Sequence, residues 1–485
     1  MASEVLDFIY MIYIYLNGHE EMNSVQTAVQ IFMPNEKYKP VECVQNEGIT
    51  VKSSINGNTA AAELYENGER VCARNEELDW RGKRHALSSS VYHMLKEKTG
   101  QYTPWGMMTG IRPAKSINTY IDNGLSVEES IMRLIGIFEI TRPKAELAAK
   151  VALAERDILK KADSGGISLY IGIPFCPTRC LYCSFTSYPL DKYSGKVDAY
   201  IEALIKELRF IGEKAEGKRL DSIYIGGGTP TSLSAQQLDT LMAAVSEIFD
   251  TGGLLEYTVE AGRPDTITPE KLAVIKKNGA GRISINPQTM NDKTLQLIGR
   301  RHSVDDIKRV YYEAREAGHK NINMDLILGL PGETETEVSH TMSEIALLAP
   351  ESLTVHTLAV KRASALREKL GEYNLAKAMQ MEKMLDISSK GAQDMGLSPY
   401  YMYRQKNMLG SFENVGYSKK GFESVYNVVI MEETQTIFAA GAGASTKLYD
   451  RKSGRIERIF NVKNVDEYIG RIDEMIDRKR KGIVF

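Results

Sequence analysis

The chain contains few cysteines, no secretory signal and no long apolar run. Only five of its 485 residues are cysteines. No apolar run approaches the 18 or more residues of a membrane span. The start of the chain lacks the basic residues and cleavage pattern of a signal peptide. We therefore expect a cytoplasmic protein with reduced thiols rather than disulfides.

A charge of one sign is also missing. Lys and Arg total 61 and Asp and Glu total 63, so the net charge of −2 gives no bulk attraction to nucleic acid. At 485 residues the chain is too long for one ordinary core. We expect a monomer or weak oligomer made of four segments: an N-terminal α/β accessory domain (1–115), a helical linker (116–165), a β/α domain (166–360) and a C-terminal region (361–485).

Three of the five cysteines lie in one loop with the spacing C-x3-C-x2-C: Cys176, Cys180 and Cys183. The loop follows an apolar run, 167–173, which is typical of a buried strand. Three soft thiolates at this spacing can hold three irons of a [4Fe–4S] cluster, and the fourth iron is then open to a ligand. A structural zinc site would need a fourth ligand, and the loop contains no histidine. The distant Cys43 and Cys72 are expected to be buried, inert thiols, with a remote fourth ligand as the alternative.

The N-terminal region contains short apolar runs separated by turn signals. Asn56 and Gly57 lie between two of these runs and predict a hairpin. A helical pattern follows at 81–98, and further helices are expected at 127–138 and 142–162. The short runs predict strands or a mixture of strands and helices, at 12–16, 25–32, 49–54 and 60–65.

From residue 168 onwards, apolar strand-like runs alternate with amphipathic helical runs, which predicts an α/β fold with a parallel sheet and outer helices. The helical runs include 197–213, 234–248 and 304–317. After 357 the alternation fades into an expected helix at 373–396, strands at 400–407, 412–417 and 428–440, and a closing helix at 465–480. The six strands of the alternating part are expected at 168–174, 221–225, 256–260, 282–286, 321–327 and 352–357.

Chemically distinctive positions follow or end the first five of these strands. In β/α barrels the chemistry lies at the carboxyl ends of the strands. Five such positions on one rim are more informative than any single one. In chain order they are the cysteine loop, the glycines at 226–228, Glu260, Gln288 and Asp325.

The sequence around the cysteine loop resembles the radical S-adenosylmethionine enzymes, with Tyr182 just before the third cysteine. Three stretches resemble, within that superfamily, the oxygen-independent coproporphyrinogen III oxidase (coproporphyrinogen dehydrogenase) family: LYIGIPFC at 169–176, GGGTPT at 226–231 and DLILGLPG at 325–332. The branch with an extra N-terminal domain is marked by PWGMMTGIRPAK at 104–115 and YRQKN at 403–407. The resemblance covers 168–359 and implies an incomplete (β/α)6 barrel with an N-terminal α/β accessory domain and a C-terminal extension.

The resemblance implies a reaction of haem biosynthesis, the oxidative decarboxylation of coproporphyrinogen III to protoporphyrinogen IX by a 5′-deoxyadenosyl radical. The implied cofactors are a [4Fe–4S] cluster on Cys176, Cys180 and Cys183, and S-adenosyl-L-methionine. A reductant such as flavodoxin or ferredoxin is the implied protein partner, and a tetrapyrrole is the substrate. No catalytic side chain is assigned beyond the cluster and the cofactor. The implied cofactor-binding residues are Tyr170, Tyr182, Gly227, Gly228, Thr229, Glu260, Gln288, Arg300 and Asp325.

The family assigns these positions separate roles. The glycine run contacts the methionine end of the cofactor, because backbone without a Cβ can approach a ligand closely. Glu260 holds the amino group or the ribose, and Asp325 the ribose hydroxyls. Gln288 and Arg300 match contacts to a second S-adenosylmethionine. The alternatives are a strand-end carboxylate already satisfied by the protein at Glu260 and a solvated helix charge at Arg300.

Tyr170 and Tyr182 match residues that pack against the cofactor, although a strand tyrosine such as Tyr170 can also belong to the core. The resemblance implies that the C-terminal region (361–485) covers the substrate, and this region carries basic residues suited to the propionates of the substrate. His356, at the end of the sixth strand, either points into the barrel or belongs to the core or surface. The basic residues are Lys361, Arg362, Arg404 and Lys406.

Two positions depart from the pattern of the oxidase. Phe185 replaces a fourth cysteine, and Gly172 replaces a histidine four residues before the first cysteine. A phenylalanine at position 185 is shared with the related haem chaperones. Two alternatives therefore stay open: a haem chaperone of the same superfamily, and a radical enzyme that acts on another tetrapyrrole such as haem.

Overall fold

The structure is a computed structural model that describes residues 11–34, 36–110, 112–162, 165–185, 187–361, 364–368, 378–405 and 412–483. It divides into two compact units. The N-terminal unit comprises Met1–Ala149 with Arg404–Phe412, and the barrel unit comprises Lys150–Tyr403 with Glu413–Phe485. The four-segment division expected from the sequence stays a prediction. Within the described residues, no helix combines the length and apolar character needed to cross a membrane.

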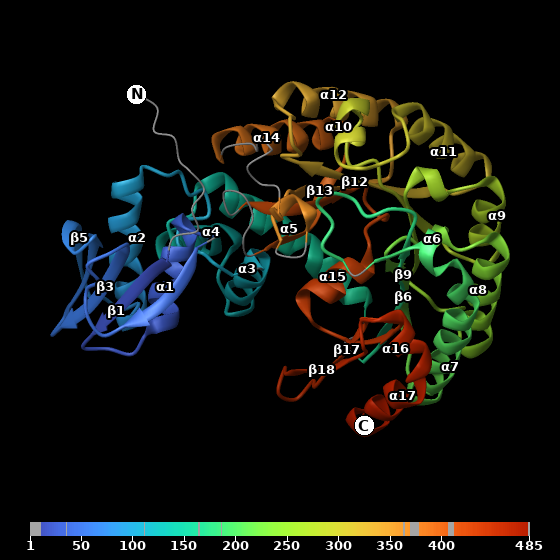
Figure 1. Ribbon diagram of the computed structural model, residues 1–485, viewed down its shortest axis with the longest axis horizontal. Coiled ribbons are helices and arrows are strands. Elements are labelled where there is room, and N and C mark those ends of the chain that lie inside the picture. Colours follow the sequence, from blue (N-terminus) through green and yellow to red (C-terminus); the bar gives the residue numbers. More distant parts are fainter. Residues whose placement is uncertain are drawn as a thin grey trace. The chain divides into compact units, whose positions relative to one another are not determined.

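The N-terminal unit is built on a five-stranded sheet with the order β2-β1-β3-β4-β5 (Figure 1). Its β3–β4 hairpin pairs Asn56 with Thr59, as the turn signal predicts. The expected run 25–32 is a helix, because Val25, Ala28 and Phe32 repeat at helical spacing on a buried face. The elements are β1 (Met11–Asn17), α1 (Met22–Phe32), β2 (Lys37–Val41), β3 (Ile49–Asn56), β4 (Thr59–Glu66), β5 (Glu69–Glu77), α2 (Lys83–Thr99), α3 (Pro113–Asp122), α4 (Val127–Phe138) and α5 (Arg142–Lys161), the last of which continues into the barrel unit.

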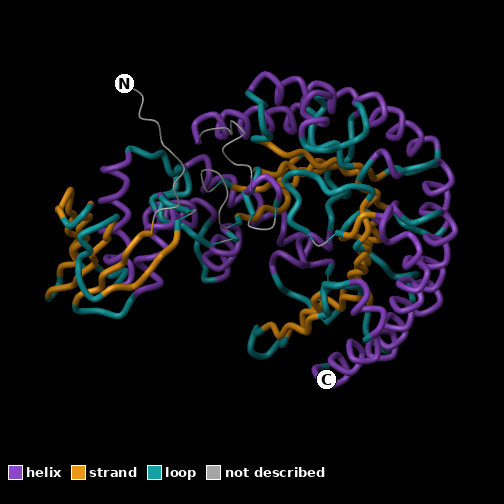
Figure 2. Tube along the Cα trace, viewed as in Figure 1, coloured by secondary structure: helices purple, strands orange, loops and turns teal. Residues whose placement is uncertain are grey.

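The barrel unit contains the six consecutive parallel strands that the sequence predicts, in the order β6-β9-β10-β11-β12-β13. Figure 2 shows these strands on the inner side of an arc and helices along its outer side. The incomplete β/α barrel is thereby confirmed. The strands are β6 (Ile167–Ile173), β9 (Leu220–Gly227), β10 (Glu256–Gly262), β11 (Arg282–Ile285), β12 (Asn321–Leu328) and β13 (Ser352–Thr357). The helices between them are α7 (Val197–Ala215), α8 (Ala235–Ile248), α9 (Pro269–Lys277), α10 (Asp292–Leu297), α11 (Val304–Glu316) and α12 (Glu335–Leu348).

Further strands extend this sheet at both ends. Beside β6 lie β16 (Thr436–Ala440), β17 (Ser445–Tyr449) and β18 (Ile456–Phe460), and beside β13 lie β15 (Glu413–Ser418) and β14 (Ser398–Arg404). The parallel pairing of β16 with β6 was not anticipated, because it joins segments some 270 residues apart. The remaining elements include β7 (Phe175–Cys176), β8 (Tyr188–Pro189), α6 (Leu190–Tyr193) and α13 (Ala365–Glu368).

Three expected C-terminal elements differ in detail. The expected strand 428–440 is a helix, α15 (Val425–Glu432), followed by β16, because its first half buries an apolar face against the core. The expected closing helix is two helices, α16 (Val465–Gly470) and α17 (Ile472–Gly482). The long helix is α14 (Ala378–Asp394), and the expected residues 373–377 and 406–407 lie outside the described part of the chain.

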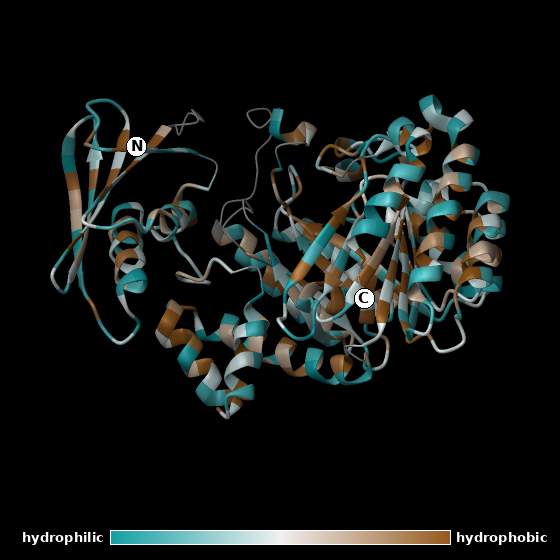
Figure 3. Ribbon diagram, turned by 90° about the horizontal axis from the view of Figure 1, so that it is seen from below, coloured by the Kyte–Doolittle hydropathy of each residue, from teal (hydrophilic) through white to brown (hydrophobic). Residues whose placement is uncertain are grey.

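Burial on both faces explains why the barrel strands are apolar. Six of the seven residues of β6 are buried, as expected for a parallel strand between two layers. Figure 3 shows hydrophobic strands in the large sheet beside helices that have hydrophilic outer surfaces. Polar residues at the ends of these strands are therefore exceptions to the apolar pattern.

A buried ion pair fastens the C-terminal helix to the barrel unit. The Lys479 Nζ lies 2.6 Å from the Glu207 carboxylate, and both side chains are fully buried. Glu207 also accepts hydrogen bonds from Tyr468 Oη (2.5 Å) and Asn461 Nδ2 (2.8 Å). These partners satisfy a carboxylate that would otherwise be costly to bury.

We expect Lys479→Met to destabilise the protein by about 3–5 kcal/mol, because it leaves the Glu207 charge buried without its cation. Urea unfolding followed by circular dichroism measures this loss. The control is Lys481→Met, at an exposed position of the same helix. Equal unfolding midpoints for the two variants would contradict the conclusion that Lys479 stabilises the buried Glu207 carboxylate.

Candidate active site

The cysteine loop leaves the carboxyl end of β6 and brings three free thiols into one short segment. Cys176 and Cys180 are buried and Cys183 is partly buried. The backbone N–H of Cys183 donates to the Cys180 carbonyl at 3.1 Å, which closes a tight turn between the second and third cysteines. The Cys176 Sγ lies 3.4 Å from Thr229 Oγ1, at the end of the neighbouring strand β9.

The thiols influence one another electrostatically. Burial and, to a smaller extent, the neighbouring Cys183 and Cys180 raise the pKa of Cys176 to about 11. Burial also raises the pKa of Cys183, with Cys180 again contributing. A bound cationic metal centre would lower these pKa values, because coordination deprotonates a thiol.

The donor set is compatible with an iron–sulfur cluster. In the described residues, no group of three or more Cys, His, Asp or Glu side chains converges as the ligands of one ion do. In a cluster each thiolate binds a different iron, so the three sulfurs need not meet around one point. Three free thiols on one loop therefore fit the expected [4Fe–4S] group.

The glycine run is held against the cysteine loop by backbone hydrogen bonds. The N–H groups of Gly228 and Thr229 donate to the carbonyls of Ile173 (2.7 Å) and Phe175 (2.8 Å). A Cβ at Gly228 would lie 2.6 Å from the Phe175 carbonyl oxygen and 3.0 Å from Cys176 Sγ. Gly227 has a positive φ of 114°, which favours glycine. This backbone has no room for a side chain beside the first cysteine.

We expect Gly228→Ala to lower both iron content and activity, the latter about 10–100-fold, because the new methyl group displaces Phe175 and Cys176. Iron and sulfide analysis of the reconstituted variant measures the first effect. Gly253→Ala is the matched control, since a Cβ there meets no atom within 4 Å. Full iron content in Gly228→Ala would show that the close approach is unimportant.

Glu260 lies near the end of β10 and faces two neighbouring strands. Tyr224 Oη donates to one of its carboxylate oxygens at 3.4 Å, and Asn286 Nδ2 donates to the other at 3.4 Å. Burial and, to a smaller extent, the charge of Asp325 raise the pKa of Glu260 to about 8. Hydrogen bonds from Tyr224 and from the Gly227 backbone only partly offset the effect of burial on this carboxylate. A perturbed carboxyl group of this kind is typical of functional sites.

Arg300 connects the barrel rim to the cysteine loop. It is buried, which excludes a solvated helix charge, and it donates to the Asn286 carbonyl (2.7 Å) and to Tyr182 Oη (3.1 Å). Burial disfavours the guanidinium charge, but attraction to Tyr182 and Cys180 leaves the pKa of Arg300 above its ordinary value. Tyr182 and Arg300, predicted separately from the sequence, are thus hydrogen-bonded partners.

Gln288 and Asp325 share a backbone connection between two strands. The Gln288 N–H donates to the Asp325 carbonyl at 2.9 Å, and Gln288 has a positive φ of 70°. Such a backbone conformation is uncommon for residues other than glycine and often occurs at functional sites. Burial opposes the charge of Asp325, but the nearby His356 and a hydrogen bond from Asn323 Nδ2 (2.6 Å) hold its pKa below the ordinary value.

His356 and Tyr170 both face the interior of the barrel unit. His356 Nε2 lies 3.8 Å from the Asp325 carboxylate, and His356 Nδ1 lies 3.2 Å from Tyr403 Oη. Tyr170 lies beside the stacked rings of Tyr224 and Tyr426, with ring centroids 6.3 and 6.4 Å away. A Cβ at Gly227 would lie 3.3 Å from Tyr170 Oη, so this tyrosine reaches the glycine run.

Sequence reasoning missed Arg263, which follows β10 and holds the cysteine loop. Its Nη1 donates to the carbonyl (3.0 Å) and hydroxyl (2.7 Å) of Thr178 and lies 3.8 Å from Cys180 Sγ. Asp265 pairs with the other end of the guanidinium at 2.6 Å. The rule that pointed to Glu260 also applies to Arg263, because both lie near the end of the third strand. Tyr224 and Asn286 were missed as well.

The expected substrate contacts are described only in part and stay a prediction. Lys361 Nζ lies 5.8 Å from the ring of Phe185, which is 66% exposed, so one basic residue does lie beside the loop. Arg404 belongs to the N-terminal unit, where it stacks on Trp105 at 5.1 Å. Arg362 and Lys406 lie outside the described residues. Cys43 is exposed rather than buried, because it lies in a surface loop after β2.

The rim therefore combines three features that chemistry on a small cofactor requires. Free thiols offer soft metal ligands, the glycine run offers backbone for close approach, and Glu260 offers a carboxylate for a polar group. Arg300 and Arg263 place positive charge beside the thiols. The nine expected cofactor-binding residues lie at or beside this rim, and contacts with the cofactor stay a prediction.

Comparisons with known proteins agree with this geometry. A family model of the Radical SAM superfamily matches residues 170–345. The chain is 42% identical over 405 residues to the oxygen-independent coproporphyrinogen-III oxidase-like protein HemZ of Bacillus subtilis (strain 168), covering 82% of this chain and 80% of that protein. It is 34% identical over 310 residues to the heme chaperone HemW of the same organism, covering 63% of this chain and 76% of that one.

Among solved structures, coproporphyrinogen III oxidase (HemN) from Escherichia coli, a radical SAM enzyme, matches with a TM-score of 0.50. The identity is 22%, and the match covers 67% of this chain and 73% of that one, which shows a common fold. The chain therefore belongs to the radical SAM superfamily and, within it, to the family of the oxygen-independent coproporphyrinogen-III oxidase-like protein HemZ.

Proposed function

We propose that this protein is a radical S-adenosylmethionine enzyme that converts coproporphyrinogen III to protoporphyrinogen IX without oxygen. One observation carries the proposal: three free thiols on one loop lie beside a glycine run and a connected polar rim at the end of an incomplete barrel. The similarity of the chain to an oxidase-like protein, over most of both chains, supports coproporphyrinogen III as the substrate.

Cys176, Cys180 and Cys183 would hold a [4Fe–4S] cluster, and S-adenosylmethionine would bind at its open iron. When bound, the reduced cluster and S-adenosylmethionine supply a 5′-deoxyadenosyl radical that abstracts hydrogen. Each propionate that reacts would lose one hydrogen atom to the deoxyadenosyl radical, one electron to a one-electron acceptor, and carbon dioxide, which leaves a vinyl group. A reductant of the flavodoxin or ferredoxin class would deliver the electrons that start each round.

The residues of the chain would bind and orient these groups. Glycines 227 and 228 present backbone to the methionine end of the cofactor, and Thr229 lies beside the first cysteine. Glu260 gains a partner in the cofactor, which satisfies a carboxylate that the protein leaves poorly paired. Asp325, kept ionised by His356, suits ribose hydroxyls.

Arg300 holds Tyr182 beside the cluster, and Tyr170 packs behind the glycine run. Gln288 contributes a backbone position next to Asp325. Binding of a second S-adenosylmethionine at Gln288 and Arg300 has less support, because the Arg300 side chain already has two protein partners.

A haem chaperone is the second candidate. Phe185 occupies the position of the oxidase's fourth cysteine, its ring is 66% exposed, and the chain is 34% identical to a heme chaperone. An exposed aromatic ring next to Lys361 suits a flat apolar molecule with carboxylates. A chaperone would bind haem without turnover.

Mass spectrometry separates the candidates. The protein is reconstituted anaerobically with iron and sulfide, reduced, and given S-adenosylmethionine with coproporphyrinogen III. The proposal expects 5′-deoxyadenosine together with a tetrapyrrole lighter by two formic-acid equivalents. Deoxyadenosine formed only with haem would favour a radical enzyme acting on haem, and haem binding without deoxyadenosine would favour the chaperone.

A further inference from the structure

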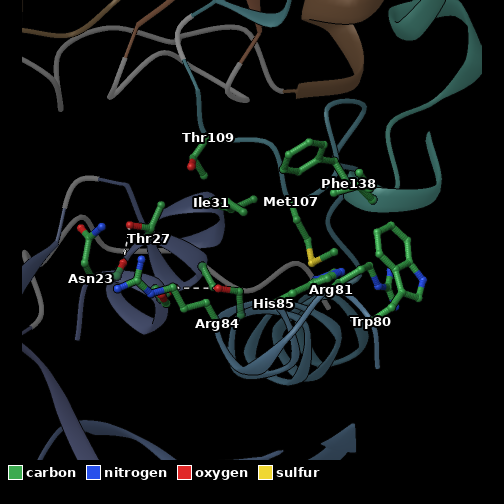
Figure 4. A pocket seen from close by; sticks show the side chains of 14 residues that line it. Asn23, Thr27, Ile31, Trp80, Arg81, Arg84, His85, Met107, Thr109 and Phe138 are labelled. Atoms are coloured by element: carbon green, nitrogen blue, oxygen red, sulfur yellow. Dashed lines mark hydrogen bonds between the residues drawn. The ribbon is translucent and has the colours of Figure 1, made fainter. Parts of the chain in front are cut away.

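The N-terminal unit contains a pocket that the proposed reaction does not use. Its volume is about 510 Å³, and all of its lining residues belong to this unit. The walls come from α1, from the turn and first helical turn of α2, and from two later segments at 107–109 and 137–138. In Figure 4 side chains from these segments surround a common space.

Basic side chains line part of the pocket. Arg81, Arg84 and His85 line it, and none of its described lining residues is acidic. Arg84 pairs with Glu21 at 2.9 Å, and Arg81 pairs with Asp79 at 2.7 Å, but neither carboxylate lines the pocket. Helix α2 begins here with no acidic residue in its first turn, so its dipole adds to the positive field.

His85 offers a polar atom that the protein does not use. Its Nε2 is buried and has no hydrogen-bond partner in the described structure. Buried polar atoms are nearly always paired, so an unpaired nitrogen in a pocket wall points to a missing partner. A ligand with a hydrogen-bonding group would supply it.

The rest of the wall combines apolar side chains with uncharged polar ones, which are Asn23, Ser24, Thr27, Ser88 and Thr109. Trp80 is 71% exposed, which is unusual for so large an aromatic side chain, and Arg133 lies 5.4 Å from its ring. The remaining apolar lining residues are Ala28, Ile31, Met107, Ile137 and Phe138. A concave apolar surface with a few convergent polar groups is the usual form of a small-molecule site.

We propose that this pocket binds a small aromatic anion. Its ring system lies against Trp80, Met107 and Phe138, and its anionic group faces Arg84 and His85. The site is separate from the cysteine loop and needs no cluster. Failure of the proposed decarboxylase activity would therefore leave this proposal standing.

The test uses the full-length protein and 8-anilinonaphthalene-1-sulfonate, a fluorescent aromatic anion. N-phenyl-1-naphthylamine, which has the same rings without the sulfonate, is the matched neutral probe. The chain has two tryptophans, Trp80 and Trp105, and both lie in the N-terminal unit. Energy transfer from tryptophan to the probe that is lost when the pocket is filled therefore reports binding in this pocket.

Arg84→Gln is expected to weaken binding of the anionic probe about 3- to 10-fold and to leave the neutral probe unchanged. Substitution of Arg84 is expected to disturb the fold little, because its side chain is 79% exposed. The control is Arg70→Gln, another exposed arginine paired with a glutamate, outside the pocket. Thr27→Phe, which fills the pocket from α1, is expected to abolish energy transfer with both probes.

Three results would overturn the proposal. One is binding of the anionic probe without energy transfer from tryptophan. Another is an equal effect of Arg84→Gln and Arg70→Gln. The third is an equal effect of Arg84→Gln on the anionic and neutral probes. Circular dichroism of each variant shows that the fold is kept.

Discussion

Replacing Cys180 with alanine is expected to reduce deoxyadenosine formation more than about 1,000-fold, because without the cluster little beyond the uncatalysed reaction remains. Cys180 is the middle cysteine of the loop, buried and 3.8 Å from the Arg263 guanidinium. Its loss removes one of three thiolates and leaves a positive charge beside the gap. Iron and sulfide analysis and the visible absorbance of the reconstituted protein measure cluster loss directly.

The chain supplies its own control for this experiment. Cys43→Ala makes the same substitution at an exposed cysteine of the N-terminal unit. We expect full iron content and unchanged activity, since this thiol lies on another unit. Equal iron loss in Cys43→Ala would support the alternative in which Cys43 is a remote fourth ligand of the cluster. A Cys180→Ala variant that still binds iron fully would contradict the three-cysteine site.

Replacing Glu260 with glutamine is expected to stabilise the ligand-free protein at alkaline pH while lowering its activity. The pKa of Glu260 is about 8 in the folded protein, raised by burial and by Asp325, and near 4.5 when unfolded. Between these values the folded state keeps a proton that the unfolded state releases. Stability therefore falls as the pH rises through this window and is lowest above about pH 8.

The neutral amide of the variant has no such penalty. From pH 5.5 to 8.5, wild type is expected to lose roughly 2–3 kcal/mol of unfolding free energy relative to Glu260→Gln. Urea unfolding of both proteins at the two pH values measures the difference, with the exposed Glu216→Gln as control. Parallel pH dependences for wild type and Glu260→Gln would show that Glu260 is not a strained carboxyl group.

Local patterns predicted most of the barrel and the positions on its rim. Six β/α units have a strong alternation, and the carboxyl-end rule places the cysteine loop, Glu260 and Asp325 on one edge. Tyr182 and Arg300 were both expected at the site, but their hydrogen bond joins residues 118 apart and no local pattern reveals it. Arg263 was missed because arginines are common on surfaces, and only the fold buries this one against the loop.

Errors arose where local signals were ambiguous or the partner was distant. The apolar run of α1 fits a strand or a helix, and only its burial at three- and four-residue spacing decides between them. The strand β16 pairs with β6 across most of the barrel unit, so its place in the sheet depends on long-range packing. The pocket beside Trp80 combines four separate segments, and no single stretch of sequence indicates it.

The central claim is that the rim cleaves S-adenosylmethionine and directs the resulting radical at a propionate side chain. Coproporphyrinogen III deuterated at the β-carbons of its propionates tests this directly. The account predicts 5′-deoxyadenosine heavier by one mass unit, because the abstracted deuterium ends on its 5′-carbon. Unlabelled deoxyadenosine from this substrate, formed at the same rate without it, would contradict the account.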